Sequence, residues 1–384
     1  MHILTFTQQL AGFRSGVGNY AYSLISGLNA SGHQLTVVTL NEEIINIPGV
    51  RMIGLPRATL DPSPGGWVTL GVNFADYFKS HYHNFDVAHF TDAREAWRVR
   101  KPTLPVTGMV NDSYALDWMN PNYPRRTYSD RLSRGLYYGF LRKMEGMTYP
   151  RLDALIANSR HVRQEITRGY ELDTAKICVI HYGLQQPKED TPLPLTGSPA
   201  IVFVGGNFFR KGLPLLMQAA ASLRSRFPDI HLHVVGKDSN QPAIAALAAK
   251  LHMTRSVTFH GRQPNDKVRR IMAGADIFAL PSATEGFGLV YVEAMQAGTP
   301  VIATRIGGAH EVFVENSEAV FVDPRDVGGL SQAIEKIASD KKFAQTLREG
   351  GRKAASRFTV DSMVKQTEKL WESILSKGSG CRFM

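Results

Sequence analysis

Two glutamates eight positions apart are the side chains of this sequence best suited to chemistry. They lie in DIFALPSATEGFGLVYVEAMQAGTPVIAT, residues 276–304, as Glu285 in a loop and Glu293 one turn into a helix predicted from about 289 to 297. Both carboxylates can face the same cleft, and a carboxylate accepts two hydroxyl hydrogen bonds at once, which suits a sugar. A lone glutamate is more often a solvated surface residue, so the interpretation depends on the residues around the pair.

The residues around the two acids suit an anion. An apolar run ends in the loop PSATEGFG, where Gly286 and Gly288 let the backbone approach a ligand closely. The N–H groups of Leu289 and Val290 open the predicted helix, have no partner inside it and can bind a phosphate. Carboxylates repel a phosphate unless a sugar lies between them. The whole string therefore predicts a ligand with both phosphate and sugar parts.

A second candidate site lies in FVGGNFFRKGLPLLMQAA, residues 203–220. A predicted strand is followed there by Arg210 and Lys211, and a helix begins near Gly212. Two cations at the carboxyl end of a strand can neutralise a diphosphate and stabilise it as a leaving group. Taken alone, the tripeptide RKG is more often surface charge.

The pattern E-G-F-G-L-x-x-x-E-A-M-x-x-G-x-P-V-I resembles the E-x7-E motif of glycosyltransferase family 4, whose members are retaining enzymes with the GT-B fold. The resemblance covers nearly the whole chain and is densest between 200 and 325. It implies that Glu293 binds the ribose hydroxyls of a donor nucleotide. It also implies that Glu285 lies against the transferred sugar and that Arg210 and Lys211 contact the donor diphosphate.

Other positions of the family's site are matched less specifically. A glycine loop follows the first strand in the family, which implies that Gly16, with Gly18 beside it, contacts the distal phosphate or the sugar. After the strand at 105–110, members often have a His-Asp pair, and this chain has Asn111 and Asp112. Asn111 would then face the sugar and Asp112 the acceptor, with a simple Asn-Asp-Ser turn as the alternative. The remaining donor-binding positions implied by the resemblance are Gly261, Arg262, Gly286, Phe287, Gly288, Leu289 and Val290.

The resemblance implies a reaction that retains anomeric configuration. No second carboxylate suited to be the nucleophile of a double displacement is evident. We expect a front-face route similar to that commonly proposed for the family, in which the leaving diphosphate accepts the acceptor's proton. Catalysis would then depend on Glu285, Arg210, Lys211 and Asn111. No Asp-x-Asp metal site is evident, so we expect no cofactor and activity that is independent of metal ions.

The elements that must position these residues alternate between short apolar runs and helical patterns. This predicts an α/β fold of two tandem doubly wound, Rossmann-like domains with an interdomain cleft, the GT-B arrangement. The boundaries are predicted at 1–186 for an acceptor-binding domain and 199–360 for a donor-binding domain, joined by the proline-rich stretch 185–199. An amphipathic helix at 361–376 is expected to pack back on the first domain. Strands are expected at 2–6, 34–40, 86–90, 105–110, 154–158, 200–206, 231–236, 256–261, 276–282, 300–304 and 319–323.

The chain's formal net charge of +10 favours a polyanionic partner, and half of it lies in residues 120–151. Tyrosines are interleaved with the cations of this segment. It is interpreted either as a solvated helical face with packed tyrosines or as a docking site for an anionic membrane or a lipid-linked or phosphorylated acceptor. No apolar run approaches the length of a membrane span, and MHILTFT lacks a basic leader. We therefore expect a cytoplasmic protein, with peripheral attachment to the inner membrane face as an addition.

The expected activity is that of a hexose transferase that uses a nucleotide diphosphate-sugar and a saccharide or lipid-linked acceptor, and three other classes of protein are alternatives to it. A sugar-nucleotide epimerase on the same scaffold is the main alternative. A nicotinamide oxidoreductase would need a clean GxGxxG with a following acid, and a nucleic-acid binder would need a recognisable reading element. GDP-mannose, UDP-glucose and UDP-N-acetylglucosamine all fit as donors, and the loop GVGNY favours mannose by its resemblance to several mannosyltransferases.

Overall fold

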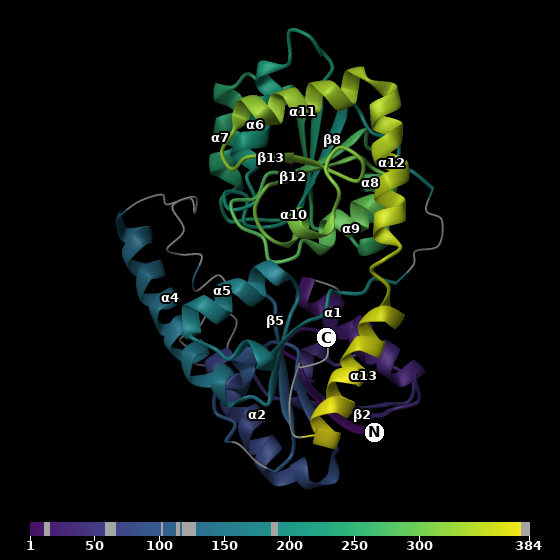
Figure 1. The fold of residues 1–384 in the computed structure, drawn as a ribbon. Helices are drawn as coiled ribbons and strands as arrows, with labels where there is room; N and C mark the ends of the chain where they lie inside the picture. The colour runs from purple at the N-terminus through teal and green to yellow at the C-terminus, as the bar shows by residue number, and fades with distance from the viewer. Residues whose placement is uncertain are drawn as a thin grey trace. The chain divides into compact units, whose positions relative to one another are not determined.

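The computed structural model describes residues 1–10, 16–57, 67–100, 103–112, 116, 128–185 and 191–377, with the backbone alone for 67, 68 and 128–134. These residues form two compact units (Figure 1). Unit 1 contains the described part of 1–185 together with 358–377, and unit 2 contains 191–357. The chain thus returns to unit 1 at Phe358.

Unit 1 is built on a parallel sheet with the strand order β3-β2-β1-β4-β5-β6-β7 within the described residues. The order reverses between β1 and β4, so helices that follow the strands on either side cover opposite faces of the sheet. Its strands are β1 (His2–Phe6), β2 (Gln34–Leu40), β3 (Val50–Leu55), β4 (Val87–Phe90), β5 (Val106–Val110), β6 (Ala154–Ala157) and β7 (Ile177–Val179).

Alternate residues of the unit 1 strands enter two different cores. Leu4 and Phe6 of β1 join Phe90 and a set of residues from α2 and α5 on one face. Because side chains alternate along a strand, the intervening residues face the other layer, where α13 packs against α1. The helices of this unit are α1 (Gly16–Ala30), α2 (Trp67–His81), α4 (Tyr128–Thr148), α5 (Arg160–Tyr170) and α13 (Val360–Lys377), with 3₁₀ turns η2 (Asn41–Glu43), η3 (Tyr82–Asn84), η4 (Ala93–Ala96), η5 (Tyr149–Arg151) and η6 (Thr174–Lys176).

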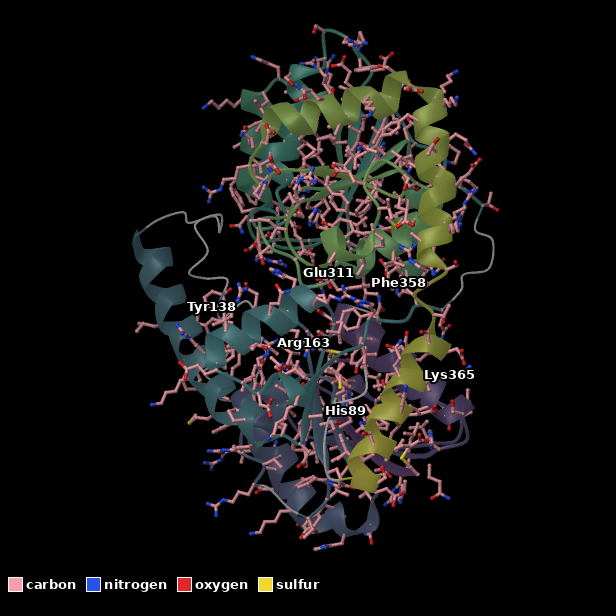
Figure 2. The ribbon with its side chains drawn as sticks, in the orientation of Figure 1. His89, Tyr138, Arg163, Glu311, Phe358 and Lys365 are labelled. Atoms are coloured by element: carbon pink, nitrogen blue, oxygen red, sulfur yellow. The ribbon has the colours of Figure 1, made fainter. Side chains whose placement is uncertain are left out.

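A buried chain of hydrogen bonds ties α1 and α13 to the sheet. The imidazole of His89 on β4 is 3.1 Å from the Tyr20 hydroxyl of α1 and 3.0 Å from the Thr107 hydroxyl of β5. The Trp371 indole of α13 donates to the same Thr107 hydroxyl at 3.1 Å. Burial lowers the pKa of His89 to about 3, so it is neutral. Figure 2 shows His89 inside unit 1, with Lys365 on the outer side of α13.

Unit 2 is a second parallel sheet, with the strand order β10-β9-β8-β11-β12-β13 within the described residues. Here the order reverses between β8 and β11. The strands β8, β11 and β12 are buried, largely apolar runs, as expected where both faces are covered. They are β8 (Ala200–Val204), β9 (His231–Val235), β10 (Val257–Gly261), β11 (Ile277–Leu280), β12 (Val301–Thr304) and β13 (Val320–Val322).

The helices of unit 2 form two layers around its sheet (Figure 1). One layer packs α11 against α6 and α6 against α7, and the other packs α9 against α8 and α12. Asp326 and Asp340 cap α11 and α12 by accepting from backbone N–H groups, which explains where those helices begin. The helices are α6 (Leu213–Ser222), α7 (Gln241–Lys250), α8 (Asn265–Ala273), α9 (Leu289–Gln296), α10 (Gly308–Val312), α11 (Val327–Ser339) and α12 (Lys341–Ala355), with the 3₁₀ turn η7 (Thr254–Ser256).

The predicted fold class is confirmed, with differences at the ends of elements. The strand expected at 276–282 is β11, which begins at Ile277 and ends at Leu280. β3 was not predicted, because Arg51 and Gly54 interrupt its apolar pattern. The last helix extends the expected 361–376 by one residue at each end.

Candidate active site

The two segments singled out in the C-terminal half meet at the point where the strand order of unit 2 reverses. The loop after β8 carries Lys211, and the loop after β11 carries Glu285. Their side chains form an ion pair. Neighbouring parallel strands bring their carboxyl ends together, so residues 74 positions apart in the sequence become partners.

The Glu285 carboxylate is held in a buried, polar environment. Glu285 is 8% exposed, and the hydroxyl of the fully buried Ser282 donates to it at 3.4 Å. Burial alone would raise the pKa of Glu285, but Lys211 and then Arg210 outweigh burial and hold the pKa below its usual value. Burial lowers the pKa of Lys211, against the opposing attraction of Glu285. The carboxylate is therefore ionised at neutral pH.

Glycines set the shape of the loop around Glu285. Gly288 has φ of 84° and precedes α9, and a Cβ there would lie 2.3 Å from the Tyr291 ring. Gly307 has φ of 83°, and its Cβ would lie 1.9 Å from the Glu285 carbonyl oxygen. Both positions require a residue without a side chain. Tyr291 is itself fixed, because its hydroxyl donates to the Leu280 carbonyl at 3.0 Å.

Arg210 is built into the same corner. It is 9% exposed, and its guanidinium donates to the Thr284 carbonyl at 3.1 Å, one residue before Glu285. The Ala283 N–H returns a bond to the Arg210 carbonyl at 2.7 Å. These two hydrogen bonds join the loops after β8 and β11, and Arg210 and Lys211 both act on the buried Glu285 carboxylate.

The other predicted donor-binding residues of unit 2 lie at the edge of the sheet where the strands have their carboxyl ends, or in α9. Leu289 and Val290 are the first two residues of α9, whose N–H groups have no partner within an α-helix. Glu293 is half-buried in the second turn of that helix. Gly261 ends the edge strand β10 with φ of 65°, and Arg262 after it is exposed. Gly286 and Phe287 are buried in the loop.

Unit 1 has its own charged cluster where its strand order reverses. Arg94, in η4 after β4, donates to both oxygens of Asp92 and contacts both oxygens of Asp112 at 3.2 and 3.3 Å. Glu145 of α4 lies 3.7 Å from the same guanidinium. A cavity of about 240 Å³ adjoins this cluster. Among the described residues, its lining is Gln8, Gln9, Val17, Asp92, Arg94, Glu95, Asp112, Tyr137 and Leu141.

The two residues of the Asn-Asp pair lie in different environments. Asn111 is buried: its side-chain amide donates to the Thr91 carbonyl at 2.8 Å and accepts from the Tyr182 hydroxyl at 2.5 Å. Asp112 is the member of the pair that lines the cavity. Gly16 is exposed at the start of α1, one residue before Val17 of the cavity lining.

In the basic segment 120–151, the backbone is described from residue 128 and the side chains from residue 135. The described side chains therefore do not include Arg125, Arg126, Arg131 and Arg134. Most of the described part is α4. Tyr137 and Tyr138 pack on Leu141 and Met144, as the packed-tyrosine interpretation expects. The opposite face is exposed and carries Leu136 and Phe140.

Two further observations concern metals and membranes. Within the described residues, no group of three or more His, Cys, Asp or Glu side chains has the arrangement of a metal site. None of the described helices combines the length and the apolar character that a bilayer span requires.

Sequence reasoning did not single out the residues that build the unit 1 cluster. Asp92, Arg94 and Glu95 come directly after the apolar run DVAHF, and a charged stretch at the end of a predicted strand is the signal that could have found them. Glu145 offered no such signal, since it lies inside a helix and reaches the cluster only by packing.

Comparisons with known proteins agree with this geometry. The family model for glycosyl transferases group 1 matches residues 185–354, and that for glycosyltransferase family 4 matches residues 14–185. A D-inositol 3-phosphate glycosyltransferase of Corynebacterium urealyticum is 26% identical, over 97% of this chain and 94% of its own.

Solved structures resemble this chain over nearly its whole length. Sucrose-phosphate synthase from Thermosynechococcus elongatus has a TM-score of 0.81 at 22% identity, over 98% of this chain and all of its own. Anabaena Alr3699/HepE in complex with UDP-glucose has a TM-score of 0.70 at 18% identity, over 97% of this chain and all of its own. With a parallel sheet in each of two units, a glycosyltransferase motif at the switch point of unit 2, and family models that together span residues 14–354, the chain belongs to glycosyltransferase family 4 and is a glycosyltransferase of the GT-B fold.

Proposed function

We propose that this enzyme transfers a hexose from a nucleotide diphosphate-sugar to a saccharide or lipid-linked acceptor, with retention of anomeric configuration. The observation that carries the proposal is the buried trio of Arg210, Lys211 and Glu285 beside the start of α9. Two cations and a helix N-terminus suit a diphosphate, and the carboxylate suits the sugar attached to it.

The charge balance of Arg210, Lys211 and Glu285 explains how these side chains would assist the departure of the diphosphate. One carboxylate and two cations leave an excess of positive charge in a buried corner. When the bond from sugar to diphosphate breaks, the leaving group gains negative charge and the sugar gains positive charge. Arg210 and Lys211 stabilise the negative charge of the leaving group, and Glu285 stabilises the positive charge of the sugar. These side chains need not rearrange, because the ion pair of Lys211 with Glu285 is already formed. The leaving diphosphate then accepts the proton of the attacking hydroxyl.

A binding experiment can identify the nucleotide base of the donor. HepE binds UDP-glucose, which supports a uridine donor, and the GVGNY loop favours GDP-mannose. A thermal-shift panel of UDP, GDP and ADP with their sugars separates these, since a ligand at a hundred times its Kd adds about 2.7 kcal/mol of stability. We expect one base to raise Tm by several degrees. If no nucleoside diphosphate raises Tm, the proposal is wrong.

An NMR assay with the identified donor distinguishes transfer from epimerisation. NMR of the identified donor incubated alone would show a new sugar epimer if the enzyme were an epimerase. With an acceptor present, we expect a new glycosidic anomeric signal of the donor's own configuration. An inverted signal would contradict retention.

We propose that no divalent metal is needed, because Arg210 and Lys211 supply the positive charge that a metal would bring to the diphosphate. Transfer is then expected to continue in excess chelator at the rate seen without it. Complete loss that manganese restores would contradict this.

The exposed face of α4 supports a further part of the proposal, peripheral attachment to an anionic membrane. Leu136 is 70% exposed, Phe140 47% and Met147 40%. Positions three and four apart share a helix face, so these three and the exposed Lys143 form one stripe, with Arg142 beside it. An apolar stripe flanked by cations is the pattern of a helix that lies in a membrane surface.

Flotation with vesicles tests this stripe. We expect binding to vesicles that contain phosphatidylglycerol and loss of binding in Leu136→Asp/Phe140→Asp. Val314 is also an exposed apolar residue, but it lies in unit 2, so Val314→Asp is the matched control. Equal binding to neutral and anionic vesicles, or an equal loss in the control, would contradict the proposal.

A further inference from the structure

The loop after β8 is held from both sides by the strands next to it. On the β11 side, the Arg210 guanidinium donates to the Thr284 carbonyl, and the Arg210 carbonyl accepts from the Ala283 N–H. On the β9 side, the Phe208 N–H donates to the Asp238 carboxylate at 2.5 Å. β9 and β11 are the neighbours of β8 in the sheet, so one of them fixes Arg210 and the other fixes the backbone two residues earlier.

Phe208 lies at the start of the turn that carries both cations. Its side chain is fully buried, and Asp238 supplies the partner that its N–H group needs. The Phe208 carbonyl accepts from the Leu213 N–H at 2.9 Å, and the Lys211 N–H donates to the Asn207 carbonyl at 3.0 Å. These bonds close the turn around the residue that Asp238 holds.

Asp238 reaches this turn in a fixed orientation. One carboxylate oxygen accepts from the Asn240 N–H at 2.9 Å and from the Asn240 side-chain amide at 2.8 Å, while the other oxygen binds the loop after β8. The Asp238 carbonyl accepts from the Gln241 N–H at 3.1 Å, where α7 begins. The loops after β8 and β9 are also in close contact, because a Cβ on Gly236 would lie 2.2 Å from the Gly205 carbonyl oxygen. The carboxylate therefore links the start of α7 to the loop that bears the cations.

We propose that Asp238 is a positioning residue of the donor site, which holds Arg210 and Lys211 against the diphosphate by fixing the Phe208 N–H. This rests on the proposed function, in which the two cations bind that group. A hydrogen bond to an ionised acceptor is stronger than one between neutral groups, so the carboxylate fixes the loop better than a neutral acceptor would. Electrostatic support depends on cations that are already in place, and a misplacement of about 1 Å can cost about 10²-fold in rate.

Paired nucleotides measure the position of the cations without a sugar or an acceptor. A nucleoside diphosphate differs from its monophosphate by one phosphate, so the ratio of their Kd values reports how well the site holds that phosphate. Calorimetry on the full-length enzyme would compare UDP with UMP, GDP with GMP and ADP with AMP. For the base that binds, we expect the wild-type enzyme to prefer the diphosphate at least about tenfold. Lys211→Met removes one cation and should reduce this preference.

Asp238→Ala removes the acceptor of the Phe208 N–H and should lower the preference at least about threefold. The direction of the change is informative. Loss of a negative charge would by itself strengthen the binding of a diphosphate, and a general loss of structure would weaken the binding of both nucleotides equally. A fall in the ratio therefore indicates displaced cations.

Asn240→Ala is the matched control for Asp238→Ala. It removes a hydrogen bond to the other carboxylate oxygen at the start of α7 and keeps the bond to Phe208, so the ratio should stay within about twofold of wild type. An unchanged or higher ratio in Asp238→Ala, or an equal fall in Asn240→Ala, would overturn the proposal.

Asp238→Asn tests the same bond in a side chain of unchanged shape. The amide has one acceptor oxygen where the carboxylate serves donors with two, and its NH₂ group faces a donor, so the ratio should again fall. An unchanged ratio in Asp238→Asn would overturn the proposal even if Asp238→Ala does not fold.

Lys211→Met separates a failure of this inference from a failure of the proposed function. If Lys211→Met reduces the preference for the diphosphate but Asp238→Ala does not, the positioning role alone is wrong. If no diphosphate binds the wild-type enzyme more tightly than its monophosphate, the proposed donor site is wrong, and the positioning role of Asp238 is overturned with it.

Discussion

The two sheets of this enzyme place buried charge at the same topological position but with opposite balance. At the switch point of unit 2, Arg210 and Lys211 surround one carboxylate, Glu285. At the switch point of unit 1, several carboxylates surround one arginine, Arg94. The shared α/β geometry supplies the place, and the side chains set the balance of charge there.

The largest effect should come from removing the cation of unit 1. Arg94→Met leaves Asp92 and Asp112 partly buried without their partner, which costs about 3–5 kcal/mol for a broken buried pair. All four tryptophans (Trp67, Trp97, Trp118 and Trp371) lie outside residues 191–357. Urea unfolding followed by tryptophan fluorescence therefore reports on unit 1.

The matched control for this variant is Arg168→Met, at an exposed position of α5. It should change the free energy of unfolding by no more than about 0.5 kcal/mol. A cost below 1 kcal/mol for Arg94→Met would show that the acidic cluster does not depend on its arginine, and the contrast between the units would weaken.

In unit 2 the corresponding change should affect catalysis. Lys211→Met removes a cation that supports the leaving diphosphate in the proposed function, so we expect turnover to fall by about 10²–10³-fold, with weaker donor binding. Initial rates and donor titration measure both. Lys250→Met, exposed at the end of α7, should leave both within twofold. Unchanged turnover in Lys211→Met would contradict the donor site.

The acids of unit 1 should also give it a pH dependence. Burial, the first cause, raises the pKa of Glu145 to about 7, despite the opposing effect of Arg94. Between its ordinary pKa and about 7, the unfolded chain has released a proton that the folded chain keeps. Stability should therefore fall as pH rises through this window and level off above it, by about 1–3 kcal/mol in total.

Glu145→Gln should flatten this slope between pH 5 and 7 in the same fluorescence assay. The comparison of the two slopes isolates Glu145 from the other titrating groups. If the stability of the variant fell equally steeply with pH, the pH dependence would come from another titrating group.

The smallest effect is expected from Ser282→Ala. The Ser282 hydroxyl donates to Glu285 at 3.4 Å, a long bond beside a much closer ion pair. Its loss should cost about 0.5–1.5 kcal/mol and change turnover only a few-fold. A loss as large as that of Lys211→Met would mean that Ser282, and not the ion pair, fixes the carboxylate.

Much of the site in unit 2 could be predicted from the sequence because its residues stand at strand ends. Glu285 and Lys211 each follow an apolar run and precede a helix, and that pattern places both at one edge of a parallel sheet. Asn111 shows where such reasoning stops. Its position after β5 predicts a ligand contact, which stays a prediction. That its amide donates to the Thr91 carbonyl and accepts from the Tyr182 hydroxyl could not be predicted, because only the packed structure brings these residues together.

By itself, then, the sequence determined the two parallel sheets, the family and the neighbourhood of the candidate site in unit 2. Periodicity, glycine loops and motif spacing are local properties, and they persist in the fold. Only the tertiary structure decided which charges are paired, since ion pairing depends on distances between residues far apart in the chain. Glu145 meets Arg94, and Lys211 meets Glu285, because strands and helices pack them together. The resulting balance of charge, which sets what each unit can bind, exists only once the chain is folded.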